Sequence, residues 1–138
     1  MYVDRIEVTF DCGHRLLGYN GPCGVPHGHT YKAELLLQSP RLDQLGLLVD
    51  FTTLKARLKE WIDQHWDHGF LLNDRDEELK RAFSTVKGAK LFGFKGENPS
   101  AEVMARCLFQ TAREMFGDVV HSARVWESPT QYGEYFEE

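Results

Sequence analysis

The sequence predicts an α+β domain in which two main helices cover one face of a four-stranded antiparallel sheet, in the order β-β-α-α-β-β. Apolar and polar side chains alternate, in part, over residues 2–12 and fully over 28–38, which is the pattern of half-buried strands. Two longer segments that follow repeat apolar residues at helical spacing. Two further strand-like segments close the chain. This order predicts helices on one face of an antiparallel sheet.

The first long helix is predicted to begin at Asp50 or Thr52, either of which can cap it, and to end near Trp66. Its apolar face is marked by Leu54, Leu58, Trp61, Ile62 and His65. The segments after it are expected to form, in order, a turn with apolar anchors (67–73), a short charged helix (74–84) and a strand with a loop (87–96).

The second long helix has a clear start signal, with Asn98 as the N-cap and Pro99 at the first helical position. Gly117 is a natural C-terminal stop. The apolar face carries Val103, Met104, Cys107, Leu108, Thr111 and Met115. On that face Cys107 is interpreted as a small core residue. The last two strands are predicted at 119–126 and 131–136, on either side of a turn.

Length and composition favour one globular domain over residues 1–138. The chain is 42% hydrophobic and 27% charged, which is ordinary for a soluble protein. Its net charge of −5 offers no broad basic field, so nucleic acid is not an expected partner. A small anionic substrate stays possible because a few local cations can be focused in a cleft.

The three cysteines, Cys12, Cys23 and Cys107, are too few and too odd in number for a disulfide framework, and fit a reducing compartment better. The first residues lack the apolar core of a signal peptide, and no long apolar run follows, so no membrane association is expected. These features predict a cytoplasmic protein. Exposed sheet edges tend to pair, so a homo-oligomer built through the sheet is a natural expectation.

A histidine pair, His27-Gly28-His29, begins the second predicted strand. Side chains at i and i+2 of a strand point to the same face, so the two imidazoles lie side by side. His14, at the end of the first strand, is the nearest candidate for a third ligand. Three neutral nitrogens suit zinc and leave one position open, as in catalytic sites. Cys23 could instead be a fourth ligand that closes a structural site, and the residue pattern leaves both possibilities open.

Three further positions could carry chemistry. A thiol beside a cation loses its proton more easily, so Cys23 is a candidate base or nucleophile. Asp67 and His68 could form a pair in which the carboxylate orients the imidazole, although a polar helix end is an equal alternative. Glu127 ends an apolar strand and could accept two hydrogen bonds from the edge of a pterin or guanine. A solvated glutamate is the more common state of such a residue.

These segments resemble, in the same order, the 6-pyruvoyltetrahydropterin synthase superfamily, and most closely its 6-carboxytetrahydropterin synthase branch. The matching segments are residues 10–16, 23–29, 49–51, 54–55, 67–68, 72–73, 97–102 and Glu127. The three residues between Cys23 and His27 are typical of the carboxy-forming branch. The resemblance implies a tunnelling fold (T-fold) that assembles through its sheets into trimeric barrels, stacked in pairs as hexamers.

The resemblance also implies roles for the candidate residues. It makes His14, His27 and His29 zinc ligands, Cys23, Asp67 and His68 a proton-relay triad, and Glu127 the anchor of the pterin ring. The implied enzyme is a zinc-dependent lyase.

The implied reaction converts 7,8-dihydroneopterin triphosphate to 6-carboxy-5,6,7,8-tetrahydropterin, acetaldehyde and triphosphate, a step towards 7-deazaguanine and queuosine. Arg15 and Lys32 are candidate contacts for the triphosphate. The alternatives are formation of 6-pyruvoyltetrahydropterin on the same site, a zinc-containing pterin-binding protein without turnover, and a structural zinc module.

Overall fold

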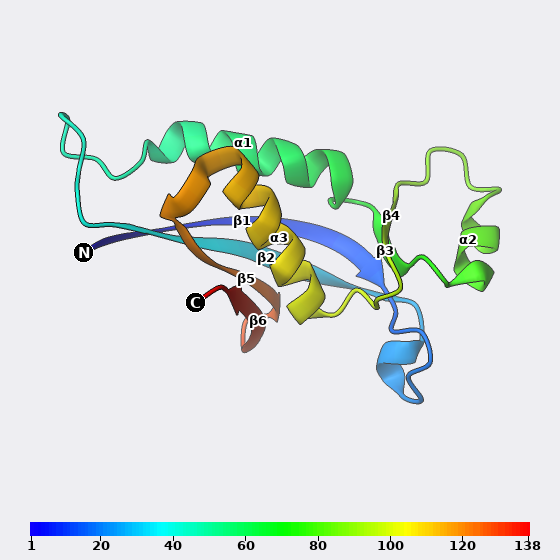
Figure 1. The fold of residues 1–138 in the computed structure, drawn as a ribbon. Coiled ribbons are helices and arrows are strands. Elements are labelled where there is room, and N and C mark those ends of the chain that lie inside the picture. The colour runs from blue at the N-terminus through cyan, green and yellow to red at the C-terminus, as the bar shows by residue number, and fades with distance from the viewer.

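Six strands form one mixed sheet, and the two long helices pack on one of its faces (Figure 1). The computed structural model describes residues 1–138. The strands are β1 (Tyr2–His14), β2 (His27–Ser39), β3 (Phe70–Asn73), β4 (Leu91–Phe94), β5 (Val120–Ser128) and β6 (Gln131–Phe136). The helices are α1 (Phe51–His65), α2 (Glu77–Phe83) and α3 (Ala101–Phe116), with 3-10 turns at Pro22–Gly24 and Gly117–Val119. No helix is both long enough and apolar enough to cross a membrane.

The strand order, β4-β3-β1-β2-β5-β6, corrects part of the predicted architecture. The α+β class is confirmed, and β1, β2, β5 and β6 pair antiparallel as expected. The four-stranded, purely antiparallel sheet was wrong, because β3 and β4 extend it in parallel beside β1. The sequence predicts a turn at Phe70–Asn73, where the structure has β3. Three of the four side chains of β3 are buried, so the strand shows no alternation from which it could be recognised.

Helix α1 begins and ends where its sequence predicts. The carboxylate of Asp50 caps it by accepting hydrogen bonds from the N–H groups of Thr52 and Thr53, at 3.0 and 3.5 Å. Its buried side chains are Leu54, Leu58 and Ile62, and Trp66 follows the last turn. The short helix α2 lies within the segment predicted to be a charged helix.

Helix α3 begins later than predicted, because Ser100 and not Asn98 is its N-cap. The Ser100 hydroxyl accepts a hydrogen bond from the Val103 N–H at 3.2 Å. The amide of Asn98 instead accepts from the N–H of Leu17 and donates to its carbonyl oxygen, at 2.9 and 3.0 Å. This pair of hydrogen bonds ties the loop between β1 and β2 to the start of α3.

The core fills the space between the sheet and helices α1 and α3. Along β1 the buried face carries Ile6, Val8, Phe10, Cys12 and His14. The buried face of β1 is therefore apolar up to its last residue, which is His14. Cys107 packs against the core, and burial raises the pKa of its thiol to about 11, as expected for a core residue.

The opposite face of the sheet is polar. Glu34 on β2 is fully buried there and accepts hydrogen bonds from the guanidinium groups of Arg5 and Arg124, at 2.5 and 3.0 Å. A buried carboxylate is tolerated when it is paired in this way. Because this face is polar, no helix packs on it, and both long helices lie on the apolar face.

Strand β6 approaches the start of α3 so closely that Gly133 has no space for a side chain. A Cβ atom at this position would lie 2.8 Å from the Glu102 nitrogen and 2.9 Å from the Ala101 carbonyl carbon. We expect Gly133→Ala to lower the free energy of unfolding by about 1–3 kcal/mol, because backbone must shift to admit the methyl group. Urea denaturation measures this.

Gly93→Ala on β4 is the matched control, since its Cβ atom would be in ordinary contact, 3.7 Å from the Cβ atom of Asp74. Equal stabilities of the two variants would contradict the close approach of β6 to α3.

Candidate metal centre and active-site cavity

Three histidines converge where β1 ends and β2 begins. His14 lies directly opposite His27 in the antiparallel pair, and His29 lies opposite Cys12, so all three imidazoles share the helix-covered face. The Nε2 atom of His27 lies 3.1 Å from that of His14 and 3.1 Å from that of His29. The potential ligand atoms of the three residues all lie within 4.8 Å of one another.

Backbone carbonyl groups orient two of the rings. The Nδ1 atom of His14 lies 2.7 Å from the Pro99 oxygen, and that of His27 lies 2.6 Å from the Val25 oxygen. A carbonyl oxygen only accepts hydrogen bonds, so Nδ1 carries the proton in both rings and the Nε2 lone pairs are free. This is the arrangement that positions metal-binding histidines.

The cluster also favours neutral imidazoles, which are the form that binds metal. Burial lowers the pKa of His14, although its hydrogen bond to Pro99 acts in the opposite direction. Burial likewise lowers the pKa of His29. The donor set of three imidazole nitrogens fits zinc in an open site. Cys23 is not a member of the cluster, so the geometry does not favour the closed four-ligand alternative.

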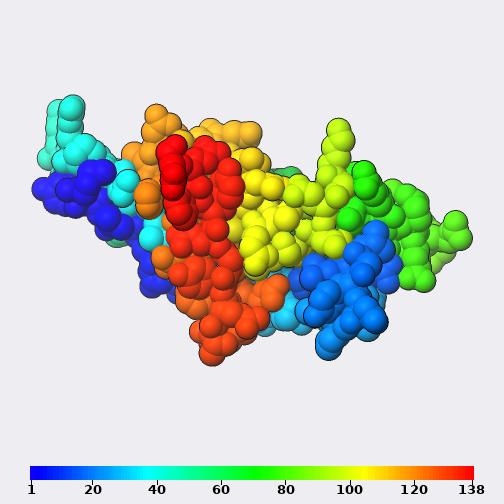
Figure 2. Space-filling view, turned by 60° about the horizontal axis from the view of Figure 1, so that its bottom comes forward, coloured from blue at the N-terminus to red at the C-terminus, as the bar shows by residue number.

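A cavity of about 240 Å³ opens beside His14. It is lined by His14, Leu16, Cys23, Ser100, Ala101, Glu102, Glu127, Gln131 and Tyr132. The fold therefore brings Cys23 and Glu127, which are far apart in the sequence, into the same cavity as the candidate metal ligand His14. Figure 2 shows the loop that carries Cys23 (blue) beside residues of α3 (yellow) and of the β5–β6 hairpin (orange).

Several wall residues were not found by sequence reasoning. Glu102 lies in the first turn of α3, and Gln131 and Tyr132 begin β6. No local pattern marks Gln131 or Tyr132 as functional, because only the packing of β6 on α3 brings them to the cavity. The first turn of α3 also presents the positive end of the helix dipole there, which favours an anionic group.

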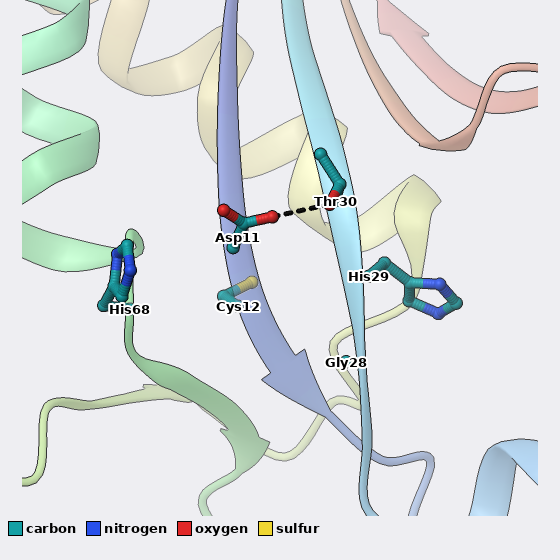
Figure 3. A pocket seen from close by; sticks show the side chains of 6 residues that line it. All are labelled: Asp11, Cys12, Gly28, His29, Thr30 and His68. Carbon is teal, nitrogen blue, oxygen red and sulfur yellow. Dashed lines mark hydrogen bonds between the residues drawn. The ribbon is translucent and has the colours of Figure 1, made fainter.

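Asp67 and His68 lie elsewhere. His68 lines a separate, open hollow of about 470 Å³ together with Asp11, Cys12, Gly28, His29 and Thr30. Figure 3 shows His68 beside β1, whereas the ring of His29 points away from it beyond β2. Within one chain, the structure does not bring the Asp67–His68 pair into the cavity that contains Cys23.

The Asp67–His68 pair is nevertheless well formed. Asp67 Oδ2 lies 2.9 Å from His68 Nδ1, and Asp67 Oδ1 accepts a hydrogen bond from the Asp11 N–H at 3.0 Å. Partial burial raises the pKa of Asp67, but these hydrogen bonds outweigh it and hold the pKa below its ordinary value. The carboxylate is therefore ionised and oriented on the imidazole, which is 78% exposed.

The two expected phosphate contacts are occupied by other partners. Arg15 donates two hydrogen bonds to Asp76, at 2.6 and 2.5 Å, and also pairs with Glu78. The Lys32 ammonium lies 4.4 Å from the centre of the Trp126 ring. Neither residue lines the cavity beside His14, and no lysine or arginine does.

An α+β sheet that ends in three convergent imidazoles, next to a cavity with a thiol and a carboxylate, defines a class of candidate metalloenzyme. The family model of 6-pyruvoyl tetrahydropterin synthase matches residues 5–138. The chain belongs to this family, whose members act on pterins.

Similar proteins agree with this assignment. The 6-carboxy-5,6,7,8-tetrahydropterin synthase of Rickettsia felis is 35% identical over 99 residues, which cover 72% of this chain and 71% of that protein. The protein of the same name from Haemophilus influenzae is 31% identical over 137 residues, covering 95% and 96%. The structure of Caenorhabditis elegans 6-pyruvoyl tetrahydropterin synthase is similar in fold, with a TM-score of 0.71 and 20% identity over 100% of this chain and 98% of that one.

The histidine cluster makes a direct prediction about metal binding. We expect the protein to bind one divalent zinc ion per chain, and His29→Ala to weaken binding by more than about 100-fold because one of three ligands is lost. Calorimetric titration of the metal-free protein with zinc measures both quantities.

His121→Ala is the matched control, because His121 is exposed and lies outside the cluster. Equal zinc affinity in the two variants would exclude the three-histidine site.

Proposed function

We propose that this protein is a zinc-dependent 6-carboxytetrahydropterin synthase. It converts 7,8-dihydroneopterin triphosphate to 6-carboxy-5,6,7,8-tetrahydropterin, acetaldehyde and triphosphate, on the route to 7-deazaguanine and queuosine. The observation that carries the proposal is the convergence of three imidazoles, one of which, His14, lines a cavity that also contains Cys23 and Glu127. The names of the similar Rickettsia and Haemophilus proteins support the carboxy-forming reaction.

His14, His27 and His29 hold the metal in this proposal. Zinc, when bound, supplies a Lewis acid that acidifies the hydroxyl and adjacent C–H groups of the substrate side chain. The protein contributes the ring orientations, through the carbonyl groups of Pro99 and Val25, and a ligand position left free for the substrate.

Cys23 acts as the base that removes a substrate proton. Its 3-10 turn, Pro22–Gly24, places it in the wall of the cavity rather than in the core. Glu127 anchors the pterin by accepting two parallel hydrogen bonds from the ring N–H and the amino group. The two residues thus divide the work, since one holds the ring and the other reacts with the side chain.

His68, oriented by Asp67, donates or accepts the second proton. Because His68 lines a separate hollow, we propose that the Asp67–His68 pair completes the cavity of a neighbouring copy. The cavity of one chain is smaller than the roughly 300–1,000 Å³ of typical small-molecule sites, and no cation lines it to meet a triphosphate. Both features are consistent with a site that a second chain completes.

The proposed assembly is a homohexamer of two stacked trimers, each a barrel built from the sheets of single T-fold domains spanning residues 1–138. The sheet has free edges at β4 and β6, which offer strands for pairing. We further propose a cytoplasmic location and a small-molecule substrate, with no nucleic-acid or membrane partner, in keeping with a net charge of −5.

A second product deserves comparison because solved structures similar to this chain are 6-pyruvoyl tetrahydropterin synthases. Their identity to this chain is 20%, which supports the fold rather than the product. A protein that only binds a pterin is less well supported, because binding alone does not need the Cys23 thiol at the cavity.

Product analysis tests the reaction itself. Zinc-loaded protein incubated with 7,8-dihydroneopterin triphosphate is expected to yield 6-carboxytetrahydropterin and acetaldehyde, identified by mass spectrometry. The 6-pyruvoyl product would reassign the chain to the other branch with the same site residues. Tight binding of zinc and pterin without turnover would overturn the enzyme proposal.

Two substitutions test the proton-transfer roles of Cys23 and His68. Cys23→Ala and His68→Ala are each expected to lower kcat by at least about 100-fold, because each removes a proton-transfer group, while zinc content stays at one per chain. Loss of zinc from Cys23→Ala would instead support a structural site.

Co-expression of the two variants with different affinity tags extends this test. With equal amounts of the two variants mixed at random, oligomers are expected to regain activity at about one quarter of their sites on average, where an intact Cys23 meets an intact His68 from another chain. Each variant expressed alone is the control. Mixed oligomers as inactive as the single variants would contradict a shared site.

A further inference from the structure

His68 is held in an unusual backbone conformation. It is the only non-glycine residue with a positive φ angle, at 59°. The left-handed region is unfavourable for a residue with a Cβ atom, so the surrounding structure must hold His68 there. Such conformations concentrate at functional sites, and the groups that maintain this one are therefore of interest.

The backbone of β1 stabilises the turn that contains Asp67 and His68 through two hydrogen bonds. The His68 N–H donates to the Asp11 oxygen at 2.7 Å, and the Asp11 N–H donates to the Asp67 carboxylate at 3.0 Å. The Asp11 side chain is itself fixed by a hydrogen bond from the Thr30 hydroxyl at 2.6 Å, drawn as a dashed line in Figure 3.

Lys90 stabilises the same turn from the side of helix α1. Its ammonium group donates to the carbonyl oxygens of Asp63 and Asp67, both at 2.6 Å. These carbonyls belong to the last turn of α1 and to the residue just before His68. The final carbonyls of a helix lack partners within the helix, and a cation is favourable there. Lys90 therefore joins the end of α1 to the turn that carries the imidazole.

Gly69 leaves the space that Lys90 needs. A Cβ atom at Gly69 would lie 3.1 Å from the Lys90 oxygen, 3.1 Å from the Trp66 oxygen and 3.2 Å from Lys90 Cδ. The Lys90 oxygen also accepts a hydrogen bond from the Phe70 N–H at 2.8 Å. The residue that follows the Asp67–His68 pair is thus matched to the lysine packed over it.

We propose that Lys90 is a positioning residue for the Asp67–His68 pair. By binding the carbonyl groups of Asp63 and Asp67, it keeps His68 in the left-handed conformation and keeps Nδ1 of the imidazole hydrogen-bonded to the Asp67 carboxylate. Lys90 acts through these two residues and does not itself touch the substrate. Its catalytic consequence rests on the proposed function, whereas its structural consequence does not.

The test compares Lys90→Met, which removes the donor and keeps most of the stem, with Lys90→Arg, which keeps a cation that can reach both carbonyls. Lys90→Gln is a second donor-altering variant in case the methionine variant does not fold. Lys87→Met is the matched control, because Lys87 is exposed and no hydrogen bond or ion pair involves it. Circular dichroism verifies that each variant is folded.

The first measurement is independent of activity. Nitrogen-15 NMR of the imidazole is expected to show a proton fixed on His68 Nδ1 in the wild type, Lys87→Met and Lys90→Arg. Lys90→Met is expected to show exchange between the two tautomers, because the hydrogen bond to Asp67 is no longer held. An unchanged His68 signal in folded Lys90→Met and Lys90→Gln would overturn the proposal.

The second measurement is turnover. Lys90→Met is expected to lower kcat by about 10- to 100-fold, with KM and zinc content unchanged and with recovery in Lys90→Arg. A decrease of equal size in Lys87→Met, or a normal kcat in Lys90→Met, would overturn the positioning role. If the wild type has no turnover but the His68 signal still depends on Lys90, the proposed function fails and the positioning of His68 stands.

Discussion

The antiparallel pairing of β1 with β2 is the constraint on which the site depends. Its register places His14 opposite His27 and puts both on the face that also carries the apolar core. A slip by one residue would turn one strand's side chains to the other face. The core prevents such a slip, because either Phe10 on β1 or Tyr31 on β2 would then leave the apolar side, where the two rings stack with centroids 5.3 Å apart. Burial of apolar residues thus aligns the potential metal ligands.

The helices and the C-terminal hairpin convert this aligned cluster into a site. The residue before the cap of α3 supplies the carbonyl that orients His14, and the first turn of α3 forms one wall of the cavity. β6 forms another wall because Gly133 lets it approach α3 closely. Meanwhile, the turn after α1 presents His68, hydrogen-bonded to Asp67, to a different hollow. A single chain therefore carries the residues of the proposed reaction in two places, which is the arrangement expected if the proposed oligomer completes the site.

Errors in the predicted fold come from segments too short to show a period. The four-residue strand β3 has no local pattern that distinguishes it from the predicted turn. Strand β4 lies within the predicted strand and loop at 87–96, but its parallel pairing with β3 depends on contacts distant in sequence. Asn98 had the right chemistry for an N-cap, but its amide matches the backbone of Leu17 on another loop, and Ser100 caps the helix instead. In both cases a long-range interaction outweighed a sound local preference.

The sequence by itself determined the α+β class, the two long helices and the pairing of His27 with His29, because strand and helix periods are local properties of the chain. It also singled out Cys23, Asp67, His68 and Glu127. Only the tertiary structure decided that Cys23 and Glu127 share a cavity with His14 and that His68 does not. The reason is physical: which side chains meet depends on strand order, register and helix packing, and these are set by contacts between residues far apart in the sequence.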